Sequence, residues 1–89
     1  MCRNIKPLYN FDPPASEAEI SEAALQFVRK ISGFRKPSKA NQAAFQTAVD
    51  SIAAASSRLL GALETDAPPR DRAVEAARAH ARATMRFAR

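Results

Sequence analysis

The chain has 89 residues, of which 46% are hydrophobic, and its formal net charge is +5 at pH 7. This size suffices for one small domain and excludes a second. A single cysteine excludes an internal disulfide, and no apolar run is long enough to span a membrane. The opening stretch MCRNIKPLYNF carries charges and a proline where a signal peptide needs apolar residues. We therefore expect a cytoplasmic protein without a membrane partner.

The composition predicts an all-α fold, because the chain has only two glycines and little alternation of β-branched and polar residues. We expect a single domain over residues 1–89, made of a helical hairpin, a third Ala/Arg-rich helix laid across it and an extended N-terminal arm. The positive charge favours polyanionic partners. The alternative is base composition, since a genome rich in G and C raises the Ala and Arg counts without any functional demand.

Residues 1–15 should form the arm, because three of the six prolines lie there. Burying each of its large apolar side chains would contribute about 1.5 to 3 kcal/mol, so we expect the arm to lie in a groove between helices. These side chains are Ile5, Leu8, Tyr9 and Phe11.

The first helix is expected over residues 16–32. Ser16 and Glu19 have the spacing of a capping box, and acidic residues gather in the first turns while Arg29 and Lys30 stand in the last. Gly33 suits the left-handed position that follows a helix. The predicted buried stripe consists of Ile20, Ala24, Phe27, Val28 and Ile31.

The second helix is expected over residues 38–63, with Ser38 capping its first turn. Large apolar residues recur there at helical spacing, so we expect them on one buried side. They are Phe45, Val49, Ile52, Leu59, Leu60 and Leu63. The short connection after Gly33 makes the first two helices antiparallel neighbours.

The third helix is expected over residues 68–87, with Thr65 or Asp66 as its cap. Its apolar side is thin, consisting of Val74, Ala77, Ala81 and then Thr84 or Met85, with Phe87 near the end. Four arginines recur at steps of four, four and three and form one ridge on the other side: Arg78, Arg82, Arg86 and Arg89. This ridge is either a secondary nucleic-acid contact or an ordinary solvent-exposed face.

The elbow of the hairpin is the densest concentration of positive charge, because no acidic residue lies between Ala23 and Val49. A helix N-terminus beside these cations favours a phosphate or another anion, with Ser38, Asn41 and Gln42 adding hydrogen bonds. The alternative is a solvated loop. The predicted anion-binding or nucleic-acid-binding residues are Arg29, Lys30, Arg35, Lys36, Ser38 and Lys39.

Other chemistry has little support in the sequence. Cys2 beside Arg3 is a candidate reactive thiol, but no positioned base accompanies it. His80 lies among alanines and arginines, and one Cys with one His cannot form a structural zinc site. We identify no catalytic residues, expect no metal or cofactor, and find no sequence signature for specific reading of DNA.

Several stretches resemble a small bacterial family of uncharacterised proteins. They are MCRNIK (1–6), NFDPP (10–14), LQFVRK (25–30), SGFRKPSKAN (32–41), APPRDR (67–72) and the basic tail. The resemblance covers nearly the whole chain. It implies a bacterial and cytoplasmic protein, and it brings no assigned activity to any residue.

Three functions are compatible with the sequence. The leading hypothesis is a non-enzymatic interaction module whose basic elbow binds a phosphate-bearing partner such as nucleic acid, without sequence specificity. The first alternative is a protein-protein adaptor, including a self-associating one, that completes its core against another chain. The second alternative is an enzyme or sensor that uses the Cys2 thiol.

Overall fold

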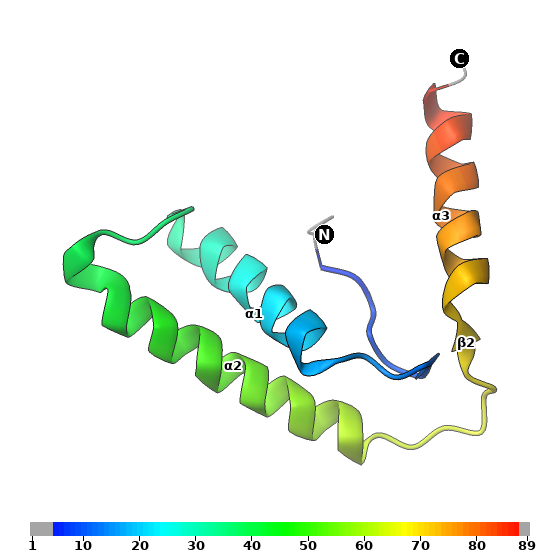
Figure 1. The fold of residues 1–89 in the computed structure, drawn as a ribbon, viewed down its shortest axis with the longest axis horizontal. Coiled ribbons are helices and arrows are strands. Elements are labelled where there is room, and N and C mark those ends of the chain that lie inside the picture. The colour runs from blue at the N-terminus through cyan, green and yellow to red at the C-terminus, as the bar shows by residue number, and fades with distance from the viewer. Residues whose placement is uncertain (1–4, 88–89) are drawn as a thin grey trace.

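The structure is a computed structural model that describes residues 5–87, except for the side chains of Arg86 and Phe87. Within this range the chain is mainly helical, which confirms the all-α prediction (Figure 1). Its elements are β1 (Phe11–Asp12), α1 (Glu17–Ser32), the 3₁₀ helix η1 (Lys39–Asn41), α2 (Gln42–Ala62), β2 (Arg70–Asp71) and α3 (Arg72–Phe87).

Helix α1 begins and ends as its sequence predicts. The Ser16 hydroxyl accepts a hydrogen bond from the Glu19 amide at 3.1 Å, and the Glu19 carboxylate accepts one from the Ser16 amide at 3.1 Å. Gly33 has a φ of 76° and donates its amide to the Arg29 carbonyl at 3.0 Å. A residue with a Cβ would be strained in this left-handed conformation, which explains the glycine.

Helix α2 begins later than predicted, because the first turn after Ser38 is the 3₁₀ helix η1. The Ser38 hydroxyl makes no capping bond to a backbone amide and instead accepts a hydrogen bond from the Asn41 side chain at 2.9 Å. The regular helix therefore runs from Gln42 to Ala62, inside the predicted range 38–63.

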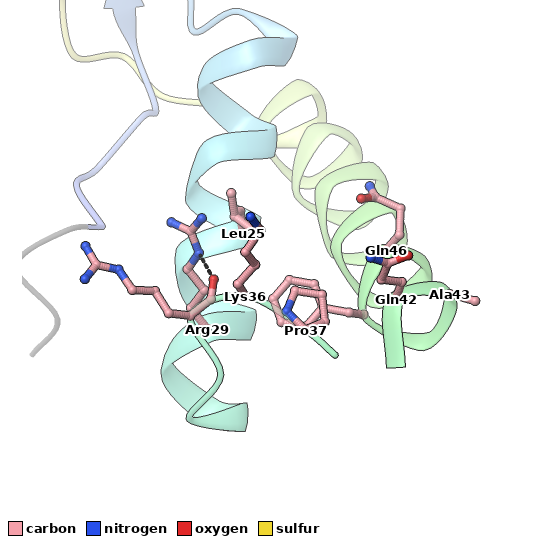
Figure 2. Close-up of a pocket in the computed structure, with 9 residues that line it drawn as sticks. Leu25, Arg29, Lys36, Pro37, Gln42, Ala43 and Gln46 are labelled. Atoms are coloured by element: carbon pink, nitrogen blue, oxygen red, sulfur yellow. Dashed lines mark hydrogen bonds between the residues drawn. The ribbon is translucent and has the colours of Figure 1, made fainter. Parts of the chain in front are cut away.

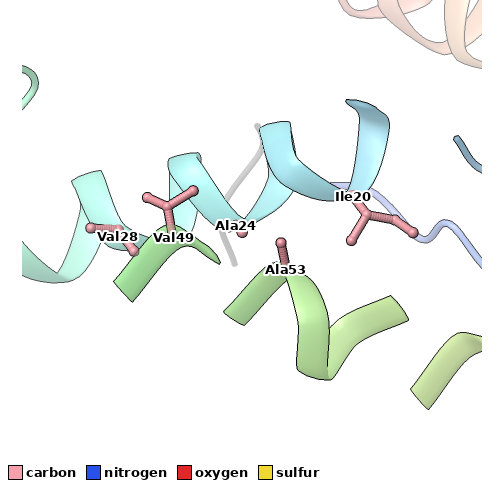
Figure 3. Packing of buried hydrophobic residues seen from close by; sticks show 5 residues of the cluster. All are labelled: Ile20, Ala24, Val28, Val49 and Ala53. Atoms are coloured by element: carbon pink, nitrogen blue, oxygen red, sulfur yellow. The ribbon is translucent and has the colours of Figure 1, made fainter. Parts of the chain in front are cut away.

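The core lies between α1 and α2, which form the expected antiparallel hairpin. Its five buried residues face one another across the two helices (Figure 3): Ile20, Ala24 and Val28 from α1, and Val49 and Ala53 from α2. Small residues at these positions let the two helices approach closely. Phe45, Ile52 and Leu60 are half-buried against this cluster.

Part of each predicted stripe was wrong, because several members point outward. Phe27 is 42% exposed and Ile31 is 67% exposed on α1, Leu59 is 57% exposed on α2, and Leu63, which directly follows α2, is 44% exposed. Each helix of the pair has only one packed neighbour, so only the edge that faces this neighbour is buried.

Of the predicted arm, residues 5–15 contain no helix, and residues 1–4 lie outside the described part of the chain. Leu8 and Ala15 pack against the core, near the C-terminal end of α2. The arm also pairs with the connector before α3: β1 and β2 are parallel, with Phe11 opposite Arg70. Asn10 has a φ of 63°, and its side-chain amide reaches the carbonyls of residues 67 and 68 at 3.3 and 3.2 Å.

Helix α3 differs most from its prediction. It begins at Arg72 rather than at 68, and its cap is Asp71, whose carboxylate accepts the Val74 amide at 3.0 Å, rather than Thr65 or Asp66. The delay follows from β2, which keeps residues 70 and 71 extended.

The expectation that the third helix lies across the hairpin was also wrong. Helix α3 packs along neither α1 nor α2 and stands apart from both (Figure 1). The radius of gyration is 15.8 Å, against about 12 Å for a compact chain of this length. Val74 and Met85 are 46% and 74% exposed, so the thin apolar side of α3 has no partner among the described residues.

Candidate functional site

A pocket lies at the elbow of the hairpin, between the end of α1 and the start of α2 (Figure 2). It is open to solvent and has a volume of about 650 Å³. Three of its lining residues are cations, Arg29, Arg35 and Lys36, and none is a carboxylate. The other lining residues are Leu25, Pro37, Gln42, Ala43, Phe45 and Gln46.

Helix α1 and the loop position the cations of the pocket. Arg29 lies in the last turns of α1 and uses its Nε to donate a hydrogen bond to the Arg35 carbonyl at 3.0 Å (Figure 2). This bond ties the loop to the helix and leaves the two Nη groups of Arg29 outside the contact. Arg35 takes part in this bond only through its backbone carbonyl, so its exposed guanidinium is also available to bind a ligand.

The other predicted residues of this site lie outside the pocket lining. Lys30, Ser38 and Lys39 are exposed around the elbow. The Ser38 hydroxyl accepts a hydrogen bond from the Asn41 side chain, which leaves the Ser38 O–H and the second amide hydrogen of Asn41 able to donate. Gln42 does line the pocket, as its predicted role requires.

No ion pair among the described residues neutralises the elbow. Both salt bridges in this part of the chain lie elsewhere, between Glu19 and Arg72 and between Glu75 and Arg78. The nearby carboxylates of Glu22 and Asp50 accept hydrogen bonds from neutral glutamine side chains of their own helices. Among the described residues, no carboxylate is therefore paired with the five elbow cations, which are Arg29, Lys30, Arg35, Lys36 and Lys39.

This arrangement is chemically suited to an anion that carries a flat or apolar group. Two guanidinium groups and an ammonium can contact phosphate oxygens, and arginine does so with a planar fork of donors. Beside them, Leu25, Pro37 and Phe45 supply an apolar wall. The Gln46 amide donates to Asp50 at 2.9 Å, which fixes its orientation at the rim.

The arginine ridge of α3 is only partly described. Arg78 donates to the Glu75 carboxylate at 3.4 Å, and Arg82 is exposed. Because they directly follow Ala77 and Ala81, they lie along one edge of the apolar stripe and not on the opposite side as expected. The Arg86 side chain and Arg89 lie outside the described part of the chain.

The remaining candidates are isolated. His80 is exposed on α3, and Cys2 lies outside the described residues, so its predicted role as a reactive thiol stays a prediction. Within residues 5–87, no three His, Cys, Asp or Glu side chains stand close enough to hold a metal ion.

A polar junction that the sequence did not predict joins the arm, α1 and the start of α3. Arg72 binds both carboxylate oxygens of Glu19, at 3.0 and 3.1 Å, and its Nε donates to the Pro13 carbonyl at 2.8 Å. The guanidinium carbons of Arg70 and Arg72 lie 5.6 and 5.3 Å from the centre of the Phe11 ring, within cation-π range.

This junction also affects the charge state of Glu19. Hydrogen bonds from Arg72 and from the Ser16 backbone lower the pKa of Glu19. The sequence signal was the pair of distinctive stretches NFDPP and APPRDR, but neither stretch indicates by itself that the two meet.

Comparison with known proteins adds a family but no activity. No described helix has both the length and the apolar character that crossing a membrane requires. No curated protein and no solved structure matches the chain. The sequence model of a family described as an uncharacterized conserved protein, DUF2277, matches residues 1–78. The match spans most of the chain, including the arm, the elbow and the junction, and we conclude that the protein belongs to the DUF2277 family.

Proposed function

We propose that this protein is a non-enzymatic interaction module whose elbow pocket binds phosphate groups of nucleic acid without sequence specificity. The observation that supports this proposal is a pocket of about 650 Å³ lined by three cations and no carboxylate. Arg29, Arg35 and Lys36 would contact phosphate oxygens. Lys30 and Lys39, which are exposed outside the pocket, would add long-range attraction.

The apolar side of the pocket supports single-stranded over double-stranded nucleic acid. Phe45 is half-buried and lies beside Leu25 and Pro37 in the pocket wall. Unpaired bases can lie against such a surface, whereas the bases of a duplex are already stacked on each other. Contacts to the backbone and to base faces do not distinguish one sequence from another, which agrees with the lack of a sequence-reading motif.

The test is fluorescence anisotropy of labelled single- and double-stranded DNA and RNA, titrated with the protein over a range of salt concentrations. We expect the logarithm of the binding constant to fall linearly with the logarithm of the salt concentration. Each phosphate contact adds about 0.7 to this slope on single strands and about 0.9 on duplex DNA. The absence of binding at low salt would refute the proposal.

The location of the site is tested with two matched double variants. Arg35→Glu with Lys36→Glu reverses two pocket cations, while Lys6→Glu with Arg58→Glu reverses two exposed cations outside the pocket. Both variants replace two cations by two carboxylates, so they change the net charge equally. The Arg35 carbonyl still accepts the Arg29 hydrogen bond in the first variant, which preserves the loop.

We expect the pocket variant to abolish binding and the control to weaken it only modestly, with unchanged helicity in both. An equal loss of affinity in the two variants would show that net charge alone drives binding and that the elbow is not a site.

A further inference from the structure

The hairpin has one apolar side that the described chain leaves uncovered. On both helices, an apolar residue stands directly before a buried one: Phe27 before Val28, Ile52 before Ala53, and Leu59 before the half-buried Leu60. We call this surface the open face. Its members are Ala23, Phe27, Ile31, Ala48, Ile52, Leu59 and Leu63.

Helix geometry places these residues on the same side of the pair. Consecutive residues of an α-helix are rotated by about 100°, so the residue before a buried one lies to one side of the contact. Turning the second helix so that it faces the first moves its preceding residues to the other side of the pair. Running the second helix in the opposite direction moves these residues back to the same side. In an antiparallel pair, the residues that precede the contact positions of both helices therefore share one side.

The arm and the elbow pocket occupy the opposite side. Leu25 and Arg29, which line the elbow pocket, directly follow the buried Ala24 and Val28. Gly61, which lies beside the arm, directly follows Leu60. This division explains why Phe27 and Leu59 stay 42% and 57% exposed although the arm packs against the core.

Helix α3 has an apolar side that no described residue covers. Its apolar stripe, which consists of Val74, Ala77, Ala81 and Met85, is about 16 Å long at 1.5 Å per residue. The open face extends about 16 Å along α2 by the same measure, from Ala48 to Leu59. A helix laid on two antiparallel helices completes a three-helix bundle. The stripe and the open face are both apolar and have compatible lengths, so they can form such a bundle.

Charge and tethering indicate that this third helix comes from a second copy. The start of α3 is held beside the start of α1 by the bonds from Arg72 to Glu19. Folded back on its own hairpin, α3 would run parallel to α1 and bring Arg78 and Arg82 toward the basic elbow. A helix from another copy can run in the opposite direction.

In that direction, the basic part of α3 meets the acidic end of α1. Arg78 and Arg82 would approach the acidic end of α1. The start of α3, where Asp71 and Glu75 balance Arg70 and Arg72, would approach the elbow without adding positive charge there. Like charges would be avoided at both ends.

We propose that two copies of this chain form a symmetric dimer in which α3 of each copy packs on the open face of the other. The two contacts are related by a two-fold axis, so every contact occurs twice and the assembly is closed. The dimer buries the exposed apolar residues of both elements and leaves the elbow pockets on the outer sides of the two hairpins.

The test is sedimentation analysis of the full chain over a range of concentrations, with three single variants. Phe27→Glu places a charge in the open face, and Met85→Glu places one in the α3 stripe. Ala79→Glu adds the same charge on the opposite side of α3 and is the control. All three positions are exposed in the single chain, so circular dichroism should show unchanged helicity.

We expect a dimer for the wild type and for Ala79→Glu. Phe27→Glu and Met85→Glu should each raise the dissociation constant at least about tenfold, as charges in the centre of an interface do. A wild-type monomer at about 1 mM, or an equal effect of Ala79→Glu, would overturn the proposal.

Mixing Phe27→Glu with Met85→Glu distinguishes a dimer in which α3 packs on the partner's open face from a dimer formed through any other surface. In a mixed dimer, the unaltered α3 of the Phe27→Glu chain can pack on the unaltered open face of the Met85→Glu chain. We therefore expect mixed dimers to form more readily than either variant associates alone. If mixing produces no more dimer than each variant alone, α3 does not pack on the partner's open face.

Discussion

Replacing Ile20 with alanine should destabilise the hairpin several-fold more than the same replacement at Ile31. Both residues lie on α1 and were expected in one buried stripe, but Ile20 is 4% exposed and Ile31 is 67% exposed. The change removes three carbon atoms, each of which contributes about 0.8 kcal/mol when fully buried. The two positions therefore share their chemistry and differ in burial.

The magnitudes follow from the buried fractions. At Ile31 about one third of the contribution applies, which gives roughly 0.8 kcal/mol. At Ile20 nearly all of it applies and the vacated space adds a further cost, so the loss should fall within about 2 to 5 kcal/mol. A chain of this length has a free energy of unfolding of about 4 to 13 kcal/mol, so Ile20→Ala removes a large share.

Urea denaturation followed by far-UV circular dichroism measures both losses, at protein concentrations low enough to keep copies apart. The slope of the free energy of unfolding against urea should be equal in the two variants if only native stability has changed. Similar losses at the two positions would refute the division of α1 into a buried and an exposed edge. If the proposed dimer forms, the cost of Ile31→Ala should rise with protein concentration.

Three further predictions concern single side chains. Because Arg72 lowers the pKa of Glu19, ionised Glu19 stabilises the folded state. The stability advantage of the wild type over Glu19→Gln should be complete above the ordinary pKa of 4.5 and should disappear as the pH falls through the lowered pKa. Thermal unfolding of both proteins across this pH range measures the advantage. Gly33→Ala should cost about 1 kcal/mol in urea denaturation, because φ is 76° there and an added Cβ meets no atom within 4 Å that could compensate. Gly61→Ala, at an ordinary helical position with equally open surroundings, should instead gain up to about 1 kcal/mol by the same assay, and a loss would show that the position requires glycine.

The elbow pocket could be predicted only in part from the sequence. The cations of the loop were found because they are close in the chain, and three of the six predicted residues line one pocket. Leu25 and Phe45, which form part of its wall, were assigned to no site or to the core. Their role depends on how the ends of α1 and α2 are placed across the elbow, and local sequence patterns do not specify that placement.

The limits of helix α1, the extended arm, and the helical nature of the second and third segments follow from the sequence alone. They depend on interactions within a few residues of each other: the Ser16 and Glu19 capping box, the left-handed Gly33, the prolines of the arm and the spacing of apolar residues. Such local interactions can be inferred from spacing because the chain itself holds the partners together.

Only the tertiary structure decided which apolar residues are buried and where α3 lies. Periodicity shows that Phe27 and Val28 belong to one apolar side, but the direction of approach of α2 buries Val28 and leaves Phe27 exposed. Likewise, Arg72 and Glu19 are 53 residues apart, and their pairing holds the start of α3 beside α1. Contacts between distant segments depend on the packing of the whole chain, and no local pattern encodes them.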